Sequence, residues 1–597
     1  MGRMVAVVSL SCLLFLLSAG IPSAAQGVDP LMSRVGGTPP SALVPGPSAH
    51  AEQEGKVVFK SQTVLVQVPV IVTEKSGVHV HGLKKEDFKL LENGKEQKVT
   101  AFEEVSAVKT PLVVSPNPPN TFSNLALSPE QPRAITVIAV DTINTSVLDQ
   151  AYARRELVKY LANNLDSGQV LGLVVIGSKG LRVLSGITND PKILITALKK
   201  ASGEIPAMNG INVDAQAAAS LPATGGTSEL VGGLGPVEAE SSAKVQASVD
   251  QFVRNGEPLE AAYYQSRAIE MTMAAFLDIA HSLAGVPGRK SLIWATGGFP
   301  FYLDTPSSVP GGDLSLMYER AMAALNEAQV SVYPVDARGL VNYLPAADGT
   351  IAPGSAADGL SHGMGRTVQS NNRSWLQSST LDSLKDFADM TGGRAFYNRN
   401  DIHNGFARAA DDSSSFYLLG FYLDAHNDKA GWRKLQVKVQ RKDVEVRSRT
   451  GFFVTKATVD PAASRQLDIS TALLSPFDST GIPVTVGWQG VADAGAKKKV
   501  EFAIHVPANG VTFDTADSNR FDIDFVAQAT KNGKAEASVA QVAKGALPPD
   551  KMAEIAAQGV RYSSGLELAP GDYQVRFVVR DNLTGRVGSV SATLKVQ

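Results

Sequence analysis

Hydrophobic residues recur in a regular order along the chain, and this order predicts its structural elements. Valine stands at every second position from 64 to 72, which is typical of a half-buried strand. ITVIAV (135–140) and VLGLVVI (170–176) are near-continuous apolar runs, as in strands covered on both faces of a parallel sheet. Two similar runs lie at 291–294 and 330–335. Amphipathic patterns predict helices at 148–165, 260–284, 314–328, 381–390 and 402–410.

Strands that alternate with helices at this spacing predict an α/β fold class. We expect a doubly wound parallel sheet, Rossmann-like in arrangement, as the central domain at 133–432. Two segments rich in Gly, Ser and Ala break the rhythm, and we interpret 201–258 and 339–376 as insertions.

The regions on either side of the central domain are rich in strand patterns. Residues 57–106 predict a small β-rich domain that contains an Asn93-Gly94 hairpin turn. The charged hairpin KLQVKVQRKDVEVRSRTGFFV (434–454) is also strand-rich, so our hypothesis is that 433–455 completes the small domain. A linker is predicted at 107–132, and residues 456–597 predict an immunoglobulin-like β-sandwich.

The first residues predict export. Arg3 is followed by a short apolar run and then by Ser23-Ala24-Ala25, the pattern of a signal peptide at 1–25. A flexible tether at 26–56 follows, and we expect a periplasmic or extracellular protein. The single cysteine, Cys12, lies inside the predicted signal peptide, which excludes disulfides and thiolate metal sites from the mature chain. No second apolar run is long enough to predict a transmembrane segment.

The overall charge argues against a nucleic-acid partner, although it does not exclude a local basic patch. The chain holds 56 basic and 58 acidic residues, whereas nucleic-acid binders normally show a strongly basic face. We therefore expect no nucleic-acid partner.

Polar residues follow the predicted central strands, where ligands bind in open parallel sheets. We expect these residues to form a partner-binding face: Asp141, Asn144, Thr145, Ser178, Thr296 and Asp336. A carboxylate beside hydroxyl groups can also hold a hard divalent cation through oxygen atoms.

Several segments resemble the bacterial von Willebrand factor type A (VWFA)-related domain family, and the resemblance spans roughly residues 57–455. They include AVDTINTSVLDQAYARRELVKYL (139–161), LIWATGGFP (292–300), VSVYPVDARGL (330–340) and MTGGRAFYNRNDI (390–402). The resemblance implies a Mg²⁺ site built on an Asp-x-Ser-x-Ser loop with a distant Thr and Asp.

Only part of that metal-binding pattern is present. Asp141 takes the first position and Thr145 the fifth, but Ile143 occupies the third and cannot ligate. The distant Asp is absent, since the chain reads Ala-Thr-Gly-Gly around Thr296. The resemblance thus implies a degenerate metal site at Asp141 and Thr145. The alternative is that Asp141 caps the helix that follows it.

We expect a protein that binds an unidentified protein partner, or assembles a complex, at the cell envelope. This follows from the family resemblance and from fold-level analogy. We expect no enzymatic activity and no cofactor, because the sequence contains no recognisable motif for a catalytic nucleophile, a general base or a phosphate-binding loop. Binding of Mg²⁺ or Ca²⁺ is the alternative. Two rivals stay open: an enzyme or cofactor-binding protein that uses the strand-end crevice, and a structural scaffold of the envelope.

Overall fold

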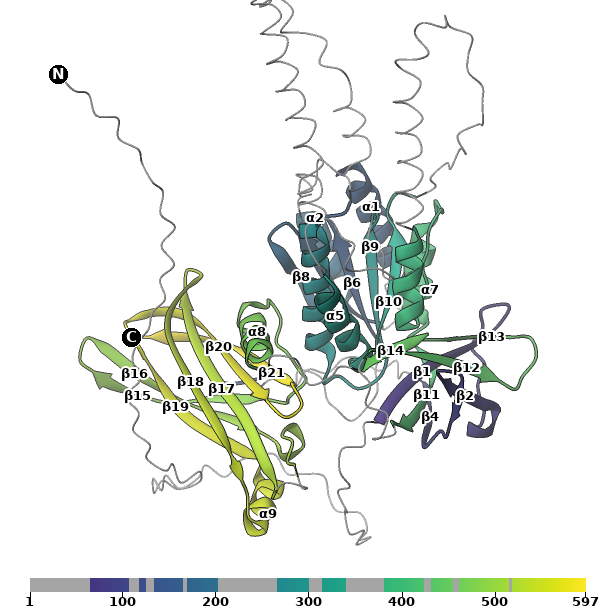
Figure 1. The fold of residues 1–597 in the computed structure, drawn as a ribbon. Helices are drawn as coiled ribbons and strands as arrows, with labels where there is room; N and C mark the ends of the chain where they lie inside the picture. The colour runs from purple at the N-terminus through teal and green to yellow at the C-terminus, as the bar shows by residue number, and fades with distance from the viewer. Residues whose placement is uncertain are drawn as a thin grey trace, which may run out of the picture. The chain divides into compact units, whose positions relative to one another are not determined.

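The structure is a computed structural model, and Figure 1 shows its ribbon. It describes residues 65–106, 117–124, 134–145, 147–164, 169–201, 266–299, 314–339, 381–423, 431–454, 461–514 and 518–597. These residues belong to one compact unit, Phe59–Gln597. The predicted signal peptide and tether lie outside the described residues, as do the two predicted insertions apart from the first residue of each.

Five strands form the central sheet in the order β10-β9-β6-β7-β8. They are β6 (Ile135–Asp141), β7 (Val170–Gly177), β8 (Gly180–Thr188), β9 (Lys290–Thr296) and β10 (Val330–Asp336). The pairs β6–β7, β6–β9 and β9–β10 are parallel, and their apolar runs are buried throughout. β8 returns beside β7 through a two-residue turn at 178–179, which permits only antiparallel pairing.

Helices pack on both faces of this sheet through two apolar clusters. One cluster joins the strands to α1 (Val147–Asn163), α2 (Pro191–Lys200) and α7 (Ile402–Asp411). The other joins them to α5 (Ser315–Glu327) and to the helical segments 266–283 and 381–391. The carboxyl ends of β6, β9 and β10 consequently share one edge, where the predicted site residues lie.

Two four-stranded antiparallel sheets form what we call the small β module. Their orders are β13-β1-β11-β4 and β14-β12-β2-β3. The strands are β1 (Leu65–Glu74), β2 (Phe88–Glu92), β3 (Lys95–Gln97), β4 (Ala101–Ser106), β11 (Ser415–Tyr422), β12 (Gly431–Val439), β13 (Val444–Ser448) and β14 (Gly451–Val454). β1 pairs with β13 and β2 pairs with β12, which are the contacts that our pairing hypothesis requires.

Local sequence explains the turn between β2 and β3. Asn93 and Gly94 both adopt positive φ, 47° and 81°, between the paired residues Glu92 and Lys95. Two left-handed residues in a two-residue loop match the right-handed twist of a hairpin. The predicted Asn-Gly turn is therefore confirmed.

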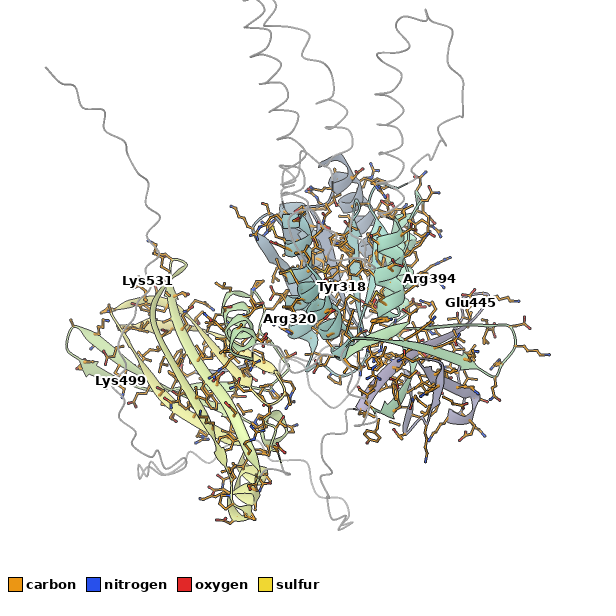
Figure 2. All side chains as sticks on the ribbon, in the orientation of Figure 1. Tyr318, Arg320, Arg394, Glu445, Lys499 and Lys531 are labelled. Atoms are coloured by element: carbon orange, nitrogen blue, oxygen red, sulfur yellow. The ribbon has the colours of Figure 1, made fainter. Side chains whose placement is uncertain are left out.

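A buried arginine joins the small β module to helix α5, which packs on the central sheet. Arg449, beside β14, donates to the carbonyl oxygens of Gln67 (2.8 Å) and Asn326 (3.3 Å). Nearer the surface, Arg394 and Glu445, both labelled in Figure 2, form an ion pair of 3.4 Å.

Two further antiparallel sheets enclose the apolar core of the C-terminal region, in the orders β19-β16-β15-β5 and β18-β17-β20-β21. Their strands are β5 (Thr121–Ser123), β15 (Thr485–Ala494), β16 (Lys497–Val506), β17 (Arg520–Lys531), β18 (Lys534–Ala546), β19 (Val560–Leu568), β20 (Gly571–Asp581) and β21 (Val587–Val596). Two helices accompany them, α8 (Pro461–Leu474) and α9 (Pro549–Gln558). β5 comes from the segment predicted as a linker, and pairs with β15.

The predicted fold class is wrong. Strands make up 46% of the described residues and helices 29%, and four of the five sheets among them contain only antiparallel pairs. The central sheet is itself mixed, because the short β7–β8 turn forces an antiparallel edge strand. Among the described residues the central sheet has three parallel pairs and one antiparallel edge pair, which is not the parallel sheet that we expected, and the structure as a whole is β-rich. The prediction gave the alternating central segment too much weight against the many short strands around it.

Within the described ranges, no helix combines the length and apolarity needed to cross a membrane.

Candidate functional site

Asp141 ends β6 at the carboxyl edge of the central sheet, and its side chain is completely buried. Oδ1 accepts hydrogen bonds from the backbone N–H groups of Ile143 and Asn144, each at 3.0 Å. This arrangement closes a turn directly after the strand, as Asp side chains commonly do.

The second carboxylate oxygen of Asp141 links three elements. Oδ2 accepts from Asn144 Nδ2 (2.8 Å), Thr296 Oγ1 (2.9 Å) and Trp294 Nε1 (3.1 Å). The Asn144 amide also donates to Thr272 in the helix at 266–283 (3.1 Å). Asp141 thus ties the loop after β6 to β9 and to a helix.

Burial raises the pKa of the Asp141 carboxyl above its ordinary value of 3.8. The hydrogen bonds from Asn144, Thr296 and Trp294 act in the opposite direction, because they favour the charged form. Burial has the larger effect on this pKa, so the net shift is upward.

Thr145 completes the contact between the loop and β9. Its Oγ1 accepts from the Gly297 N–H at 2.8 Å. A Cβ at Gly297 would lie 2.9 Å from the carbonyl oxygen of Asn144, so this close approach requires glycine. The loop and the end of β9 are packed as one unit.

The arrangement around Asp141 does not fit a divalent cation. A cation needs oxygen lone pairs that face it. The five groups that contact Asp141 instead direct hydrogens at its oxygens, and the Thr145 oxygen accepts from a backbone N–H. Ile143 is buried in the apolar cluster below the loop, and the described residues hold no group of three His, Cys, Asp or Glu that could bind a metal. Asp141 and Thr145 therefore act as structural hydrogen-bond partners here.

The six residues of the predicted partner-binding face do not form one exposed surface. Asp141, Thr145, Thr296 and Asp336 are each at most 3% exposed, Asn144 is half-buried, and of the six only Ser178 is exposed. They are buried because a polar residue after a parallel strand also satisfies the hydrogen bonds of the backbone and of neighbouring side chains.

Asp336 has a partner that the sequence analysis missed. Arg338 donates to its two carboxylate oxygens from Nε (2.9 Å) and Nη2 (2.8 Å), and also from its backbone N–H (3.0 Å). The pair is bidentate and lies two residues apart in sequence, so an Asp-x-Arg spacing after a strand was the available signal.

A different surface, on the small β module, combines an exposed aromatic side chain with basic residues. β12 buries Arg433 and Leu435 on one face and exposes alternate residues on the other. We call the exposed residues the β12 strip: Trp432, Lys434, Gln436 and Lys438. The alternation KLQVKVQRK was the signal, and the sequence analysis used it only to predict a hairpin.

Trp432 is held in place at one end of the strip although 36% of it is exposed. Its ring packs edge-on against Phe453, with 5.0 Å between centroids, and Phe453 in turn packs against Tyr318 of α5 at 5.9 Å. A Cβ at Gly451 would lie 2.3 Å from the indole, so the ring lies directly over this glycine. The exposed indole is therefore supported from below by β14.

Lys434 and Lys438 are exposed, and neither ammonium group forms an ion pair with any residue that the structure describes. By contrast, Lys89, which lies opposite Lys438 on β2, pairs with Glu96 at 2.5 Å. The buried Arg433 likewise pairs with Glu92 at 2.9 Å. Lys434 and Lys438, on the outer face of this sheet, thus have no ion-pair partner among the described residues.

No protein-family model matches the chain, and no curated protein matches it. The resemblance to the VWFA-related family stays a prediction.

Proposed function

We propose that this is an exported protein that binds another protein, or assembles a complex, at the cell envelope or outside it, and that it does so through the β12 strip. One observation carries the proposal: Trp432 is exposed on a rigid sheet face and braced by Gly451 and Phe453. Exposed aromatic residues on a pre-organised support are typical anchors of protein interfaces.

The surroundings of Trp432 favour binding over a purely structural role. A tryptophan that only filled a core would be covered, because burial of a large aromatic side chain stabilises a fold most. Apart from Trp432 the strip is polar, which matches an interface with one hydrophobic anchor inside a polar rim.

Site-specific photo-crosslinking tests the proposal. A photoreactive amino acid at Gln436, in the centre of the strip, is expected to capture a discrete partner from envelope or secreted fractions. The partner is then identified, purified and titrated against the unlabelled full-length protein. We expect Trp432→Ala to weaken this binding by tenfold or more, as interface tryptophans commonly do.

Two controls define the outcome. Leu316→Ala removes another exposed apolar side chain outside the strip and is expected to leave affinity unchanged. Gly451→Ala leaves Trp432 in the chain, but its Cβ would lie 2.3 Å from the indole and 2.4 Å from the Arg433 carbonyl oxygen, so it displaces both the ring and the adjoining β12 backbone and is expected to weaken binding as well. Equal affinity of Trp432→Ala and the wild type for every captured partner contradicts the proposal and supports the scaffold alternative.

A further inference from the structure

We propose that the segment bound by the β12 strip is an extended, acidic stretch of the partner protein, and that its acidic side chains reach the cleft at the β12–β13 turn. This inference rests on the proposed function and adds the chemistry of the ligand.

The local charge is the first reason. Residues 431–454 contain seven basic and two acidic residues, although the whole chain is nearly neutral. Buried or paired arginines account for three of the seven, namely Arg433, Arg447 and Arg449. The other four are Lys434, Lys438, Arg441 and Lys442, and none forms an ion pair within the described residues.

The spacing of these cations is the second reason. Lys434 and Lys438 share one face of a strand and lie about 13 Å apart along it, at about 3.3 Å per residue. Carboxylates four residues apart in an extended peptide have the same separation. An acidic strand laid along β12 can thus face both lysines and still place an apolar residue on Trp432.

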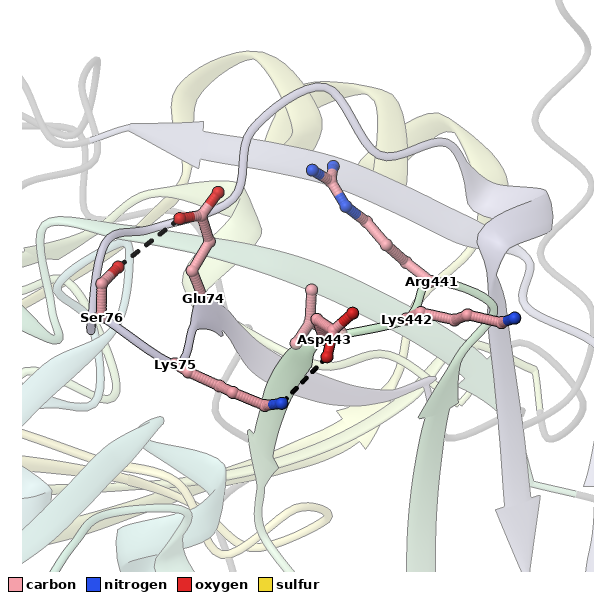
Figure 3. Close-up of a pocket in the computed structure, with 7 residues that line it drawn as sticks. Glu74, Lys75, Ser76, Arg441, Lys442 and Asp443 are labelled. Carbon is pink, nitrogen blue, oxygen red and sulfur yellow. Dashed lines mark hydrogen bonds and ion pairs between the residues drawn. The ribbon is translucent and has the colours of Figure 1, made fainter.

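The cleft at the end of the strip is the third reason. It begins three residues after Lys438 and is an open depression of about 340 Å³ between the turn after β1 and the β12–β13 turn. Its lining is Glu74, Lys75, Ser76, Arg441, Lys442, Asp443 and Val444. Figure 3 shows the Arg441 guanidinium reaching over the cleft, while Lys75 pairs with Asp443 at 2.9 Å and Ser76 bonds Glu74 at 3.5 Å. Arg441 and Lys442 are the cleft cations that remain to bind a carboxylate.

The same features favour a peptide over a nucleic acid. Single-stranded nucleic acids stack successive bases on several aromatic side chains, whereas the strip exposes one. A nucleic acid carries a phosphate at every unit and so meets Glu74 and Asp443 as well as the cations of the cleft, whereas a peptide can place neutral side chains beside these two carboxylates. A peptide offers N–H donors to these carboxylates as well as acidic side chains to the cations.

Fluorescence anisotropy with the full-length protein tests the inference. The probe is a labelled twelve-residue peptide in which Glu alternates with Thr and one end carries Phe. The comparison probe has Gln in place of every Glu. We expect the Glu peptide to bind at least tenfold more tightly at low salt, and its affinity to fall as the ionic strength rises.

Matched variants place the binding on the strip. Lys434→Gln/Lys438→Gln is expected to weaken binding of the Glu peptide about three- to tenfold, since two exposed ion pairs are lost. Lys534→Gln/Lys544→Gln removes two exposed lysines from β18 and is expected to change nothing. Lys434→Glu/Lys438→Glu should bind a peptide with Lys in place of Glu better than the wild type does, which excludes simple misfolding.

Three results would overturn the inference. They are equal binding of the Glu and Gln peptides, equal effects of the two Gln double variants, and tighter binding of oligothymidylate of equal charge. The proposed function survives any of them if crosslinking at 436 still depends on Trp432. The proposed function is contradicted on its own if the Glu peptide binds but Trp432→Ala does not weaken the binding of any protein partner.

Discussion

Two regions differ in how their charged side chains are paired: the edge of the central sheet around Asp141 and the outer face of β12. Asp141 is buried, and five donors occupy its two oxygens. Lys434 and Lys438 are exposed and carry no carboxylate partner among the described residues. A polar group whose bonding capacity is filled inside the fold serves stability, whereas unpaired surface charge remains available to a partner. The region that looked functional in sequence is therefore the structural one.

Replacement of Asp141 tests the structural side of this comparison with the largest expected effect. Asp141→Ala leaves the Trp294 indole N–H and the Asn144 amide without their buried acceptor, so we expect a loss of about 3 kcal/mol or more in the free energy of unfolding. Urea unfolding followed by tryptophan fluorescence measures it. Ser178→Ala, at the exposed turn of the same edge, should stay within about 0.5 kcal/mol. A loss below about 1 kcal/mol for Asp141→Ala contradicts the structural role.

The pH dependence of stability sharpens the comparison, because it reports on buried carboxyl groups. Burial raises the pKa of Asp278 from 3.8 to about 6, against a hydrogen bond from Ser475 and the charge of Arg576. The folded state therefore binds this proton more tightly than the unfolded state. Its contribution is complete below about pH 4 and is lost as the pH rises to about 6, for a total of up to about 3 kcal/mol.

Unfolding free energies measured from pH 4 to 7 test this sign. The contribution from Asp278 should disappear in Asp278→Asn, whose side chain does not titrate. A slope that is the same in the wild type and the variant would show that other groups cause the dependence.

The smallest effect on the free energy of unfolding is expected for the exposed lysines of the β12 strip. Lys434→Gln/Lys438→Gln removes charges that have no described partner, so the free energy of unfolding should change by less than about 0.5 kcal/mol. Thermal and urea unfolding measure it beside the peptide titration. A loss above 1 kcal/mol would mean that these lysines stabilise the sheet, and the contrast between the two regions would fail.

Local features were predictable from sequence wherever a few neighbouring residues decide the structure. The Asn93-Gly94 turn follows from the backbone freedom of those two residues, and the buried apolar run of β6 follows from its composition. Pairing between segments far apart in the sequence was predicted for the small β module, because residues 57–106 and 433–455 are both rich in strand patterns.

The other features of the fold and of the site depend on contacts between residues that are far apart in the sequence. β5 is three residues long in a segment rich in Pro and Asn, and its pairing with β15 places it in a sheet. β18 is rich in Ala and Lys, which are weak strand formers, and its partner β17 decides its conformation. The burial of Asp141 likewise depends on Trp294 and Thr296, more than 150 residues away in the chain.

The pairing of β5 has a consequence for the order in which the chain can fold during synthesis. Ser123 bonds Val484 across 361 residues, and Lys75 meets Asp443 across 368. The earliest strands thus leave the ribosome hundreds of residues before their partners exist. Neither the small β module nor the C-terminal sheets can form while only the first half of the chain has been synthesised. The small β module can take shape only after its last strand, β14 (Gly451–Val454), has been made, and the C-terminal sheets only after β21 (Val587–Val596).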